Sequence, residues 1–265
     1  MTMAFFVSIP HSGEKVPATC TWLRGLEEKI LMCDVDRFVD RLYEPHLQGV
    51  PLVKTEWHRY AVDLNRVPTD IDEQSVEGSH NRAGSHPRGY HWVLTTTEIL
   101  LMPRPMSHLQ HQELTQLIYE PFHAAIQGRY ESFREHGEHE VYHLDLHSMP
   151  SQGTRQHRDP GEGRADVVVS DCQGKSAKPE FVDLVITSYV RAGFKVGCNW
   201  PYFGGRVSEQ YGRPNQGQHC VQVELNRALY MDEVQKTLLP DKSAKTSQKL
   251  GRALQLIRQG LRDCE

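Results

Sequence analysis

A central strand of the fold is predicted by the stretch Glu140-Val141-Tyr142-His143-Leu144-Asp145-Leu146-His147-Ser148-Met149-Pro150. Polar and apolar residues alternate along it, as they do in a strand whose side chains point to opposite faces in turn. One face therefore carries His143, Asp145 and His147, and the other carries Tyr142, Leu144 and Leu146. We expect the strand to end at His147, because residues 148–151 are typical of a loop.

A second apolar run, Phe5-Phe6-Val7-Ser8-Ile9-Pro10, ends just before His11-Ser12-Gly13. Open α/β sheets gather active-site groups in a crevice at the carboxyl ends of their strands. His11 and His147 both stand at such positions. Two imidazoles at two strand ends suggest a metal site, because histidine is the commonest metal ligand.

The composition of the chain is that of an ordinary globular protein. Its 265 residues suit one α/β domain over 1–265, with a C-terminal helical extension at about 241–265. The formal net charge of −4 gives no electrostatic reason to expect nucleic acid or an anionic membrane as a partner. The 15 histidines are unusual and raise the expectation of metal chemistry. The oligomeric state is not indicated.

Six cysteines are scattered without any C-x-x-C spacing: Cys20, Cys33, Cys172, Cys198, Cys220 and Cys264. Their spacing argues against a disulfide framework and against a cysteine-type zinc site. The N-terminus lacks a basic region followed by an apolar one, and no segment approaches the roughly 18 apolar residues of a membrane span. We therefore expect a cytoplasmic protein.

Strands and helices are predicted to alternate along the chain. We expect strands at 5–10, 49–54, 59–64, 140–147, 165–170, 194–199 and 219–225, and helices at 21–32, 37–43, 108–136 (adjusted near Pro121), 178–192, 231–239 and 246–261. This rhythm predicts an α/β fold with a central, mostly parallel or mixed sheet and helices on both faces. The long segment 69–106 is either functional or contains short elements that the pattern does not reveal.

Asp34 and Asp36 allow two interpretations. Asp34 could cap the helix predicted at 37–43, with Asp36 as a first-turn carboxylate that suits the helix dipole. Alternatively, one of them is a third metal ligand beside the two histidines. The sequence pattern leaves this choice open.

Glu224 is the best candidate for a general base, because a catalytic metal centre needs a nearby carboxylate to accept and return a proton. It lies on the strand predicted at 219–225, on the same side as Gln222. The alternative is an outward carboxylate paired with Arg227. Asp145 is either the acceptor that fixes the tautomer of a ligand histidine or a solvated strand residue.

Asn65 and Arg66 follow the strand predicted at 59–64. The planar fork of Arg66 suits a substrate carboxylate, with Asn65 as a neutral donor beside it. The alternative is an ordinary ion pair between Arg66 and Asp63.

Other motifs are incomplete. Gly174-Lys175-Ser176 has Val169 where a phosphate loop needs glycine, and no G-x-S-x-G elbow supports a serine nucleophile. We expect three histidines of the long segment, His80, His86 and His91, to be surface groups.

Taken in order, several segments resemble the N-formylglutamate amidohydrolase family, whose fold is similar to zinc carboxypeptidases and aspartoacylases. The resemblance runs from about residue 5 to residue 233. It is carried by Ile9–Gly13, Asp34–Asp36, Arg41–Tyr43, Val62–Arg66, Pro121–His123, Asp145–Ser148, Gly204-Gly205, Tyr211–Pro214 and Val221–Met231.

The resemblance implies one Zn²⁺, or another divalent transition metal, bound by His11, Asp36 (with Asp34 as the fallback) and His147. It implies that Glu224 acts as general base and acid, and that Asn65 and Arg66 hold a substrate carboxylate. We expect Arg206 and Arg213 to take part in substrate binding, and the substrate to be a small anionic N-acyl amino acid such as N-formylglutamate.

The sequence also departs from the family pattern. After the paired glycines, where the family tends to have aromatic-Ile-Thr-Arg-His, this chain has Arg206-Val207-Ser208-Glu209-Gln210. An expected arginine is thus Glu209, and a cation stands instead at Arg206. Two alternatives therefore remain beside the N-acyl amino acid hydrolase: a zinc peptidase or cell-wall amidase acting on a larger substrate, and a non-catalytic metal-binding protein of the same fold.

Overall fold

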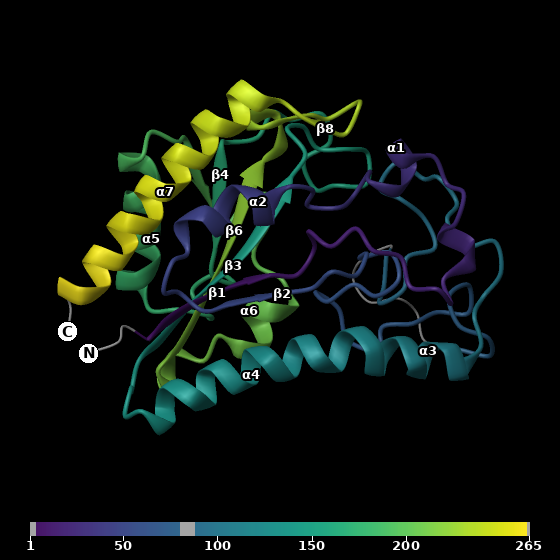
Figure 1. The fold of residues 1–265 in the computed structure, drawn as a ribbon, viewed down its shortest axis with the longest axis horizontal. Coiled ribbons are helices and arrows are strands. Elements are labelled where there is room, and N and C mark those ends of the chain that lie inside the picture. The colour runs from purple at the N-terminus through teal and green to yellow at the C-terminus, as the bar shows by residue number, and fades with distance from the viewer. Residues whose placement is uncertain (1–3, 80–87, 264–265) are drawn as a thin grey trace.

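Strand β3 (Val141–Met149) lies near the middle of a six-stranded sheet in the computed structural model, which describes residues 4–79 and 88–263 (Figure 1). The other strands of the sheet are β1 (Phe5–Ile9), β2 (Leu52–Lys54), β4 (Val167–Ser170), β5 (Val196–Cys198) and β6 (Gln218–Asn226). The helices are α1 (Glu28–Leu31), α2 (Val39–Tyr43), α3 (His108–Leu114), α4 (Glu120–Glu135), α5 (Pro179–Arg191), α6 (Arg206–Tyr211) and α7 (Pro240–Asp263). A separate hairpin joins β7 (Met231–Asp232) to β8 (Thr237–Leu238).

The strand order is β2-β1-β3-β6-β4-β5. Neighbouring strands are parallel except for β4 and β6, which pair antiparallel. The prediction of a mostly parallel or mixed sheet is therefore confirmed. Because β1, β3 and β6 are adjacent and parallel, the residues at their carboxyl ends meet at one edge of the sheet.

Helices cover both faces of the sheet, as the sequence predicted (Figure 1). Alternate strand residues such as Phe5 and Leu144 pack with α2, α5 and α7 in one apolar core. Phe6, on the opposite face, packs with α3, α4 and α6 in a second core. The period of two along β1 and β3 thus separates the two cores.

The polar residues of β3 lie on the face that α4 covers. The register pairs Asp145 with Ser8 of β1 and with Gln222 of β6, and it pairs His147 with Glu224. β3 continues for two residues beyond His147, so the predicted strand end was two residues early. The alternation predicted for His143, Asp145 and His147 is confirmed, and all three side chains are buried.

The long helix predicted at 108–136 is confirmed, including its adjustment near Pro121. A π-helical turn at Thr115–Tyr119 joins α3 to α4 and ends two residues before this proline. Proline has no N–H to donate and its ring crowds the carbonyl of the preceding turn, so the helix adjusts its hydrogen bonding there.

Three predicted elements differ from the structure. Residues 59–64 form turns instead of a strand, with local bonds such as Ala61 N–H to the His58 carbonyl. The helix predicted at 231–239 is the β7–β8 hairpin, because the Asp232 carboxylate accepts two backbone N–H groups of the turn. The helix predicted at 21–32 is interrupted at Gly25, which has a φ of 77°.

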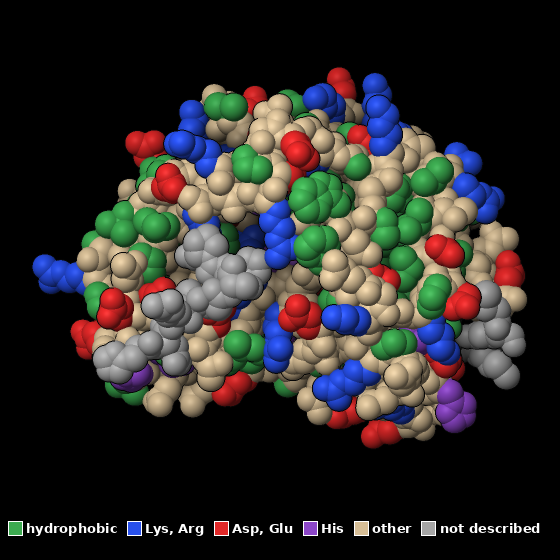
Figure 2. Space-filling model, turned by 180° about the vertical axis from the view of Figure 1, so that it is seen from behind, with side chains coloured by type: hydrophobic (Ala, Val, Ile, Leu, Met, Phe, Trp, Pro, Cys, Tyr) green, Lys and Arg blue, Asp and Glu red, His purple; other side chains and the backbone are tan. Residues whose placement is uncertain are grey.

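Acidic and basic side chains are mixed over the face shown in Figure 2. Within residues 4–79 and 88–263, the search for a helix long and apolar enough to cross a bilayer finds none.

The C-terminal helix contributes to the first core, so we predict that shortening one of its buried side chains destabilises the whole fold. Leu254 in α7 is 1% exposed. Leu254→Ala should lower the free energy of unfolding by about 2–5 kcal/mol, because the cavity left behind is only partly filled by relaxation. Urea denaturation measures this change.

The matched control is Leu109→Ala in α3, where the leucine is 65% exposed. This change should leave the unfolding free energy within about 0.5 kcal/mol of the wild-type value. Equal effects of the two substitutions would contradict the packing of α7 against the core.

Candidate metal centre and active site

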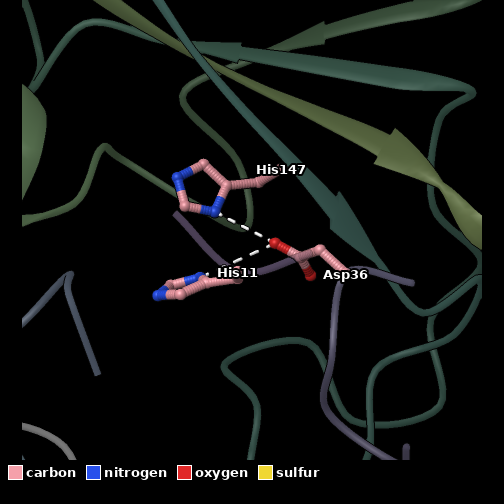
Figure 3. Close-up of side chains that lie close together, drawn as sticks. All are labelled: His11, Asp36 and His147. Carbon is pink, nitrogen blue, oxygen red and sulfur yellow. Dashed lines mark hydrogen bonds and ion pairs between the residues drawn. The ribbon is translucent and has the colours of Figure 1, made fainter. Parts of the chain in front are cut away.

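Three buried side chains from separate elements converge at the carboxyl edge of the sheet (Figure 3). His11 follows β1, Asp36 precedes α2, and His147 lies on β3. Oδ2 of Asp36 lies 3.6 Å from Nδ1 of His11 and 3.1 Å from Nδ1 of His147. One potential ligand atom from each residue lies within 4.8 Å of the others.

The structure places Asp36, and not Asp34, with the two histidines. The carboxylate of Asp34 accepts hydrogen bonds from the Tyr60 hydroxyl and from the backbone and side chain of Thr96. Neither aspartate caps α2, whose N-cap residue is Phe38. The capping interpretation is therefore wrong for both residues.

Each histidine has a carboxylate behind it. Nε2 of His11 lies 2.9 Å from Oδ1 of Asp63, and Nε2 of His147 lies 2.8 Å from Oδ2 of Asp145. A carboxylate accepts a hydrogen bond, so each Nε2 carries the proton in the neutral imidazole and each Nδ1 presents a lone pair to Asp36. The interpretation of Asp145 as a solvated residue is wrong, because its side chain is fully buried.

This arrangement fits a cation. Two lone pairs and a carboxylate oxygen face one another away from solvent, and Nδ1 of His11 has no hydrogen-bond partner. Burial alone would lower the pKa of His147, but Asp145 and Asp36 outweigh it and raise that pKa well above its usual value. The donor set of two imidazoles and one carboxylate is that of catalytic zinc sites with an open fourth position.

The support behind His147 continues through the fold as a chain of hydrogen bonds. The Ser8 hydroxyl donates to Oδ1 of Asp145 at 2.5 Å, so its oxygen must accept from Nε2 of His143 at 2.7 Å. Nδ1 of His143 is then an acceptor, and the Tyr130 hydroxyl lies 3.1 Å from it. The chain thus holds the carboxylate of Asp145 in place from α4 inward, and this carboxylate accepts the Nε2 proton of His147.

Glu224 lies beside His147 in the register of β3 and β6 and is 6% exposed. Burial raises the pKa of its carboxyl to about 7, Asp36 adds to the rise, and His147 opposes it. Arg227 does not form the ion pair expected in the alternative interpretation, since its guanidinium donates to Ser148 and Asp36. Glu224 is therefore an inward carboxylate.

A cavity of about 540 Å³ opens over these residues. Its wall includes the predicted site residues His11, Asp36, Asn65, Arg66, His147, Arg206 and Glu224. The described part of the segment 69–106 forms part of the cavity wall through Thr69, Asp70, Arg88, Trp92 and Thr96. Arg213 is absent from this wall. It lines a separate cavity of about 240 Å³ beside α4, so the expectation that it binds substrate has no structural support.

Asn65 links the wall to α6. Its Oδ1 accepts the backbone N–H of Val207 at 2.9 Å, and a Cβ at Gly205 would come within 2.1 Å of its Nδ2. The side chain of Arg66 donates to the carbonyls of Arg88 and Asn65, which fixes the guanidinium at the cavity. Asp63 pairs with Arg59 and His11 and not with Arg66, as the alternative interpretation had it; the acidic neighbour of Arg66 is Asp70, whose Oδ2 lies 4.0 Å from Nε.

A sequence model of the N-formylglutamate amidohydrolase family matches residues 3–231. The chain belongs to this family. N-formylglutamate deformylases of Pseudomonas aeruginosa and Pseudomonas putida are each 26% identical to it, over 86% and 88% of this chain and 82% and 84% of theirs.

Solved structures agree with this membership. The crystal structure of N-formylglutamate amidohydrolase from Ralstonia eutropha JMP134 superposes with a TM-score of 0.85 at 26% identity, over 98% of this chain and 95% of that one. A gene product of Agrobacterium tumefaciens, 16% identical with a TM-score of 0.71 over 98% and 91%, shares the fold. As a member of the N-formylglutamate amidohydrolase family, the chain is a hydrolase acting on a non-peptide amide bond.

Several supporting residues were not found from the sequence of this family member. Ser8, Arg59 and Asp63 act through contacts between segments that lie far apart in the chain. His91 is buried. One of its ring nitrogens hydrogen-bonds with the Ala61 carbonyl and the other with the ring of His111, so the prediction of a surface group is wrong. His80 and His86 lie outside the described residues.

The hydrogen-bond chain behind His147 predicts that Ser8→Ala weakens metal binding. The change leaves one oxygen of Asp145 and the Nε2 proton of His143 without their partner. We expect the Zn²⁺ affinity to fall by about 10- to 100-fold, as for other outer-shell changes. Competition with a chromophoric chelator measures it.

Ser243→Ala in α7 is the control, because it also removes a serine hydrogen bond, to the Pro240 carbonyl, far from the centre. It should leave the affinity unchanged. An unaltered Zn²⁺ affinity in folded Ser8→Ala would show that Ser8 does not support the metal centre.

Proposed function

We propose that this chain is a zinc-dependent amidohydrolase that hydrolyses N-formylglutamate, or a closely similar N-acyl amino acid, to the free acid and the amino acid. The observation that carries the proposal is the convergence of His11, Asp36 and His147 beside an inward Glu224. The names of the curated relatives, N-formylglutamate deformylases, support the choice of substrate.

His11, Asp36 and His147 would hold one Zn²⁺, or another divalent transition metal. Such an ion supplies a Lewis acid and lowers the pKa of bound water to about 7. The protein contributes Asp63 and Asp145, whose carboxylates accept the Nε2 protons of the two imidazoles and so orient them.

Glu224 moves the proton. A carboxyl with a pKa near 7 is ionised in part of the population at neutral pH and can therefore both accept and return a proton. Glu224 takes a proton from the attacking water as the new C–O bond forms. It then returns the proton to the amide nitrogen as the C–N bond breaks, so one water is added overall.

Cationic groups of the cavity bind the carboxylates of the substrate. Arg66 and Arg206 line the wall, and Nε of Arg206 is buried without a hydrogen-bond partner. The Asn65 amide also lines the cavity, and its oxygen accepts the backbone N–H of Val207. A guanidinium offers a carboxylate two parallel hydrogen bonds, which gives orientation as well as affinity.

One observation favours a second candidate function, the hydrolysis of a larger substrate. A further cavity of about 560 Å³ shares Gln156, His157, Tyr202, Gly204 and Glu209 with the main one. A substrate with a longer acyl group or a further residue would find room there. Comparing N-formylglutamate with N-formyl dipeptides in one kinetic assay separates the two functions.

The proposed role of Glu224 predicts that Glu224→Gln loses about 100-fold or more in kcat on N-formylglutamate while it keeps its zinc and its fold. The amide is nearly isosteric but cannot accept and return the proton. Stopped assays give the rate, and atomic absorption gives the metal content. His147→Ala is the complementary variant and should lose zinc.

Normal turnover by zinc-loaded Glu224→Gln would exclude the mechanism. Full zinc content in His147→Ala would exclude the ligand assignment.

The proposed role of Arg66 predicts that Arg66→Ala raises KM for N-formylglutamate by about 10- to 100-fold, the effect of losing a charge-assisted hydrogen bond of about 1.5–3 kcal/mol. Initial-rate kinetics measure KM and kcat separately.

Arg213→Ala is the matched control, since this arginine lines the separate cavity beside α4 and should leave KM unchanged. An identical KM in wild type and Arg66→Ala would remove Arg66 from substrate binding, and a raised KM in Arg213→Ala would restore the original expectation for that residue.

A further inference from the structure

Gln222 lies in the active-site cavity with half of its amide unused. It stands on β6, two residues before Glu224, lines the main cavity and is 2% exposed. Its Nε2 donates to Oε1 of Glu224 at 2.9 Å. Its Oε1 is buried and has no hydrogen-bond partner.

The neighbours in the sheet explain why this oxygen remains unpaired. Gln222 pairs in register with Asp145 of β3 and with Ser170 of β4. Both oxygens of Asp145 already accept, from Ser8 and His147, and a carboxylate has no proton to give. The Ser170 hydroxyl donates to the Tyr202 carbonyl. Neither register neighbour therefore offers a donor to Gln222.

The orientation of the amide follows from Glu224. Nε2 of Gln222 donates to Oε1 of Glu224, so the NH₂ group faces the carboxyl of Glu224 and the carbonyl oxygen points the other way. A buried acceptor without a partner costs free energy, because it has lost its hydrogen bonds to water. That cost is recovered when a ligand brings a donor to the oxygen.

The proposed substrate has one donor that fits. At neutral pH both carboxylates of an N-formyl dicarboxylic amino acid are ionised, and the formyl oxygen is an acceptor. The N–H of the scissile amide is therefore the only hydrogen-bond donor that the molecule carries.

We propose that Gln222 accepts a hydrogen bond from the scissile amide N–H of the substrate while its NH₂ group holds Glu224. This inference rests on the proposed function and adds a substrate class to it, because it restricts the enzyme to secondary amides. One rigid amide then fixes the distance between the leaving nitrogen and the carboxylate that protonates it.

The test is a cycle of two substrates and two proteins. N-formylglutamate and N-formyl-N-methylglutamate differ in the N–H, and zinc-loaded wild type is compared with Gln222→Met, whose side chain has similar length but does not bind an N–H. The measured quantity is kcat/KM for the N–H substrate divided by kcat/KM for the N-methyl substrate. We expect this ratio to be about 10- to 100-fold larger in wild type than in the variant. Any effect of the substitution on Glu224 that is the same for both substrates cancels in the cycle.

Gln218→Met is the matched control. Gln218 is also a buried glutamine on the same face of β6, but it lines the separate cavity beside α4. This variant should keep the wild-type preference. Gln222→Asn provides a second variant that retains an amide but withdraws it by one methylene, and it should lose the preference as Gln222→Met does.

The outcomes separate the two proposals. An equal preference in wild type and in both Gln222 variants overturns the role of Gln222 and leaves the proposed function intact. No turnover of N-formylglutamate by zinc-loaded wild type overturns the proposed function, and the role of Gln222 in that reaction with it. If the Gln222 variants lose the preference for the N–H substrate while wild type and Gln218→Met keep it, the result supports both proposals.

Discussion

The parallel register of β1, β3 and β6 is the constraint on which the site depends. It sets Ser8, Asp145 and Gln222 in one row across the sheet and places His147 beside Glu224 in the next row toward the carboxyl edge. A slip of one residue in β3 would send all of its polar side chains into the apolar core on the opposite face. The apolar packing of Leu144 and Leu146 therefore enforces the geometry of the catalytic groups.

The same arrangement concentrates buried charge. Asp36, Asp63 and Asp145 are buried, and although burial opposes ionisation, their partners hold the pKa of each carboxyl below its usual value. Arg59 and Arg227 compensate part of this charge from the side of the cavity. The two Nδ1 atoms and the shared oxygen of Asp36 still face one another beside these carboxylates. The proposed cation would satisfy all of them together.

Much of this could be predicted from the sequence, for identifiable reasons. The period of two in β3 and β6 revealed which side chains share a face, and histidines after apolar runs indicated strand ends, so His11, His147 and Glu224 were found locally. The choice of Asp36 over Asp34 was not local, because it depends on Tyr60 and Thr96 occupying Asp34. The contact of Asp63 with His11 was missed because it spans 52 positions, and only a pair of Asp63 with Arg66 was considered. The apolar residues at 59–64 match the composition of a strand, so the turns that form there could not be told from a strand by composition.

The proposed catalytic groups and the proposed substrate-binding groups occupy different parts of the architecture. His147 and Glu224 lie on strands of the sheet, where changes are costly, whereas Arg66 and Arg206 lie in a loop and at the start of α6. The loop of Arg66 and the start of α6 are joined by the hydrogen bond from the Val207 N–H to Asn65. The close approach of Gly205 to Asn65 keeps the two segments in contact. Residues farther along α6, such as Glu209, also line the cavity. We propose that the departure from the family pattern in this helix changes what the cavity admits, because His11, Asp36 and His147 come from other elements and their convergence does not depend on α6.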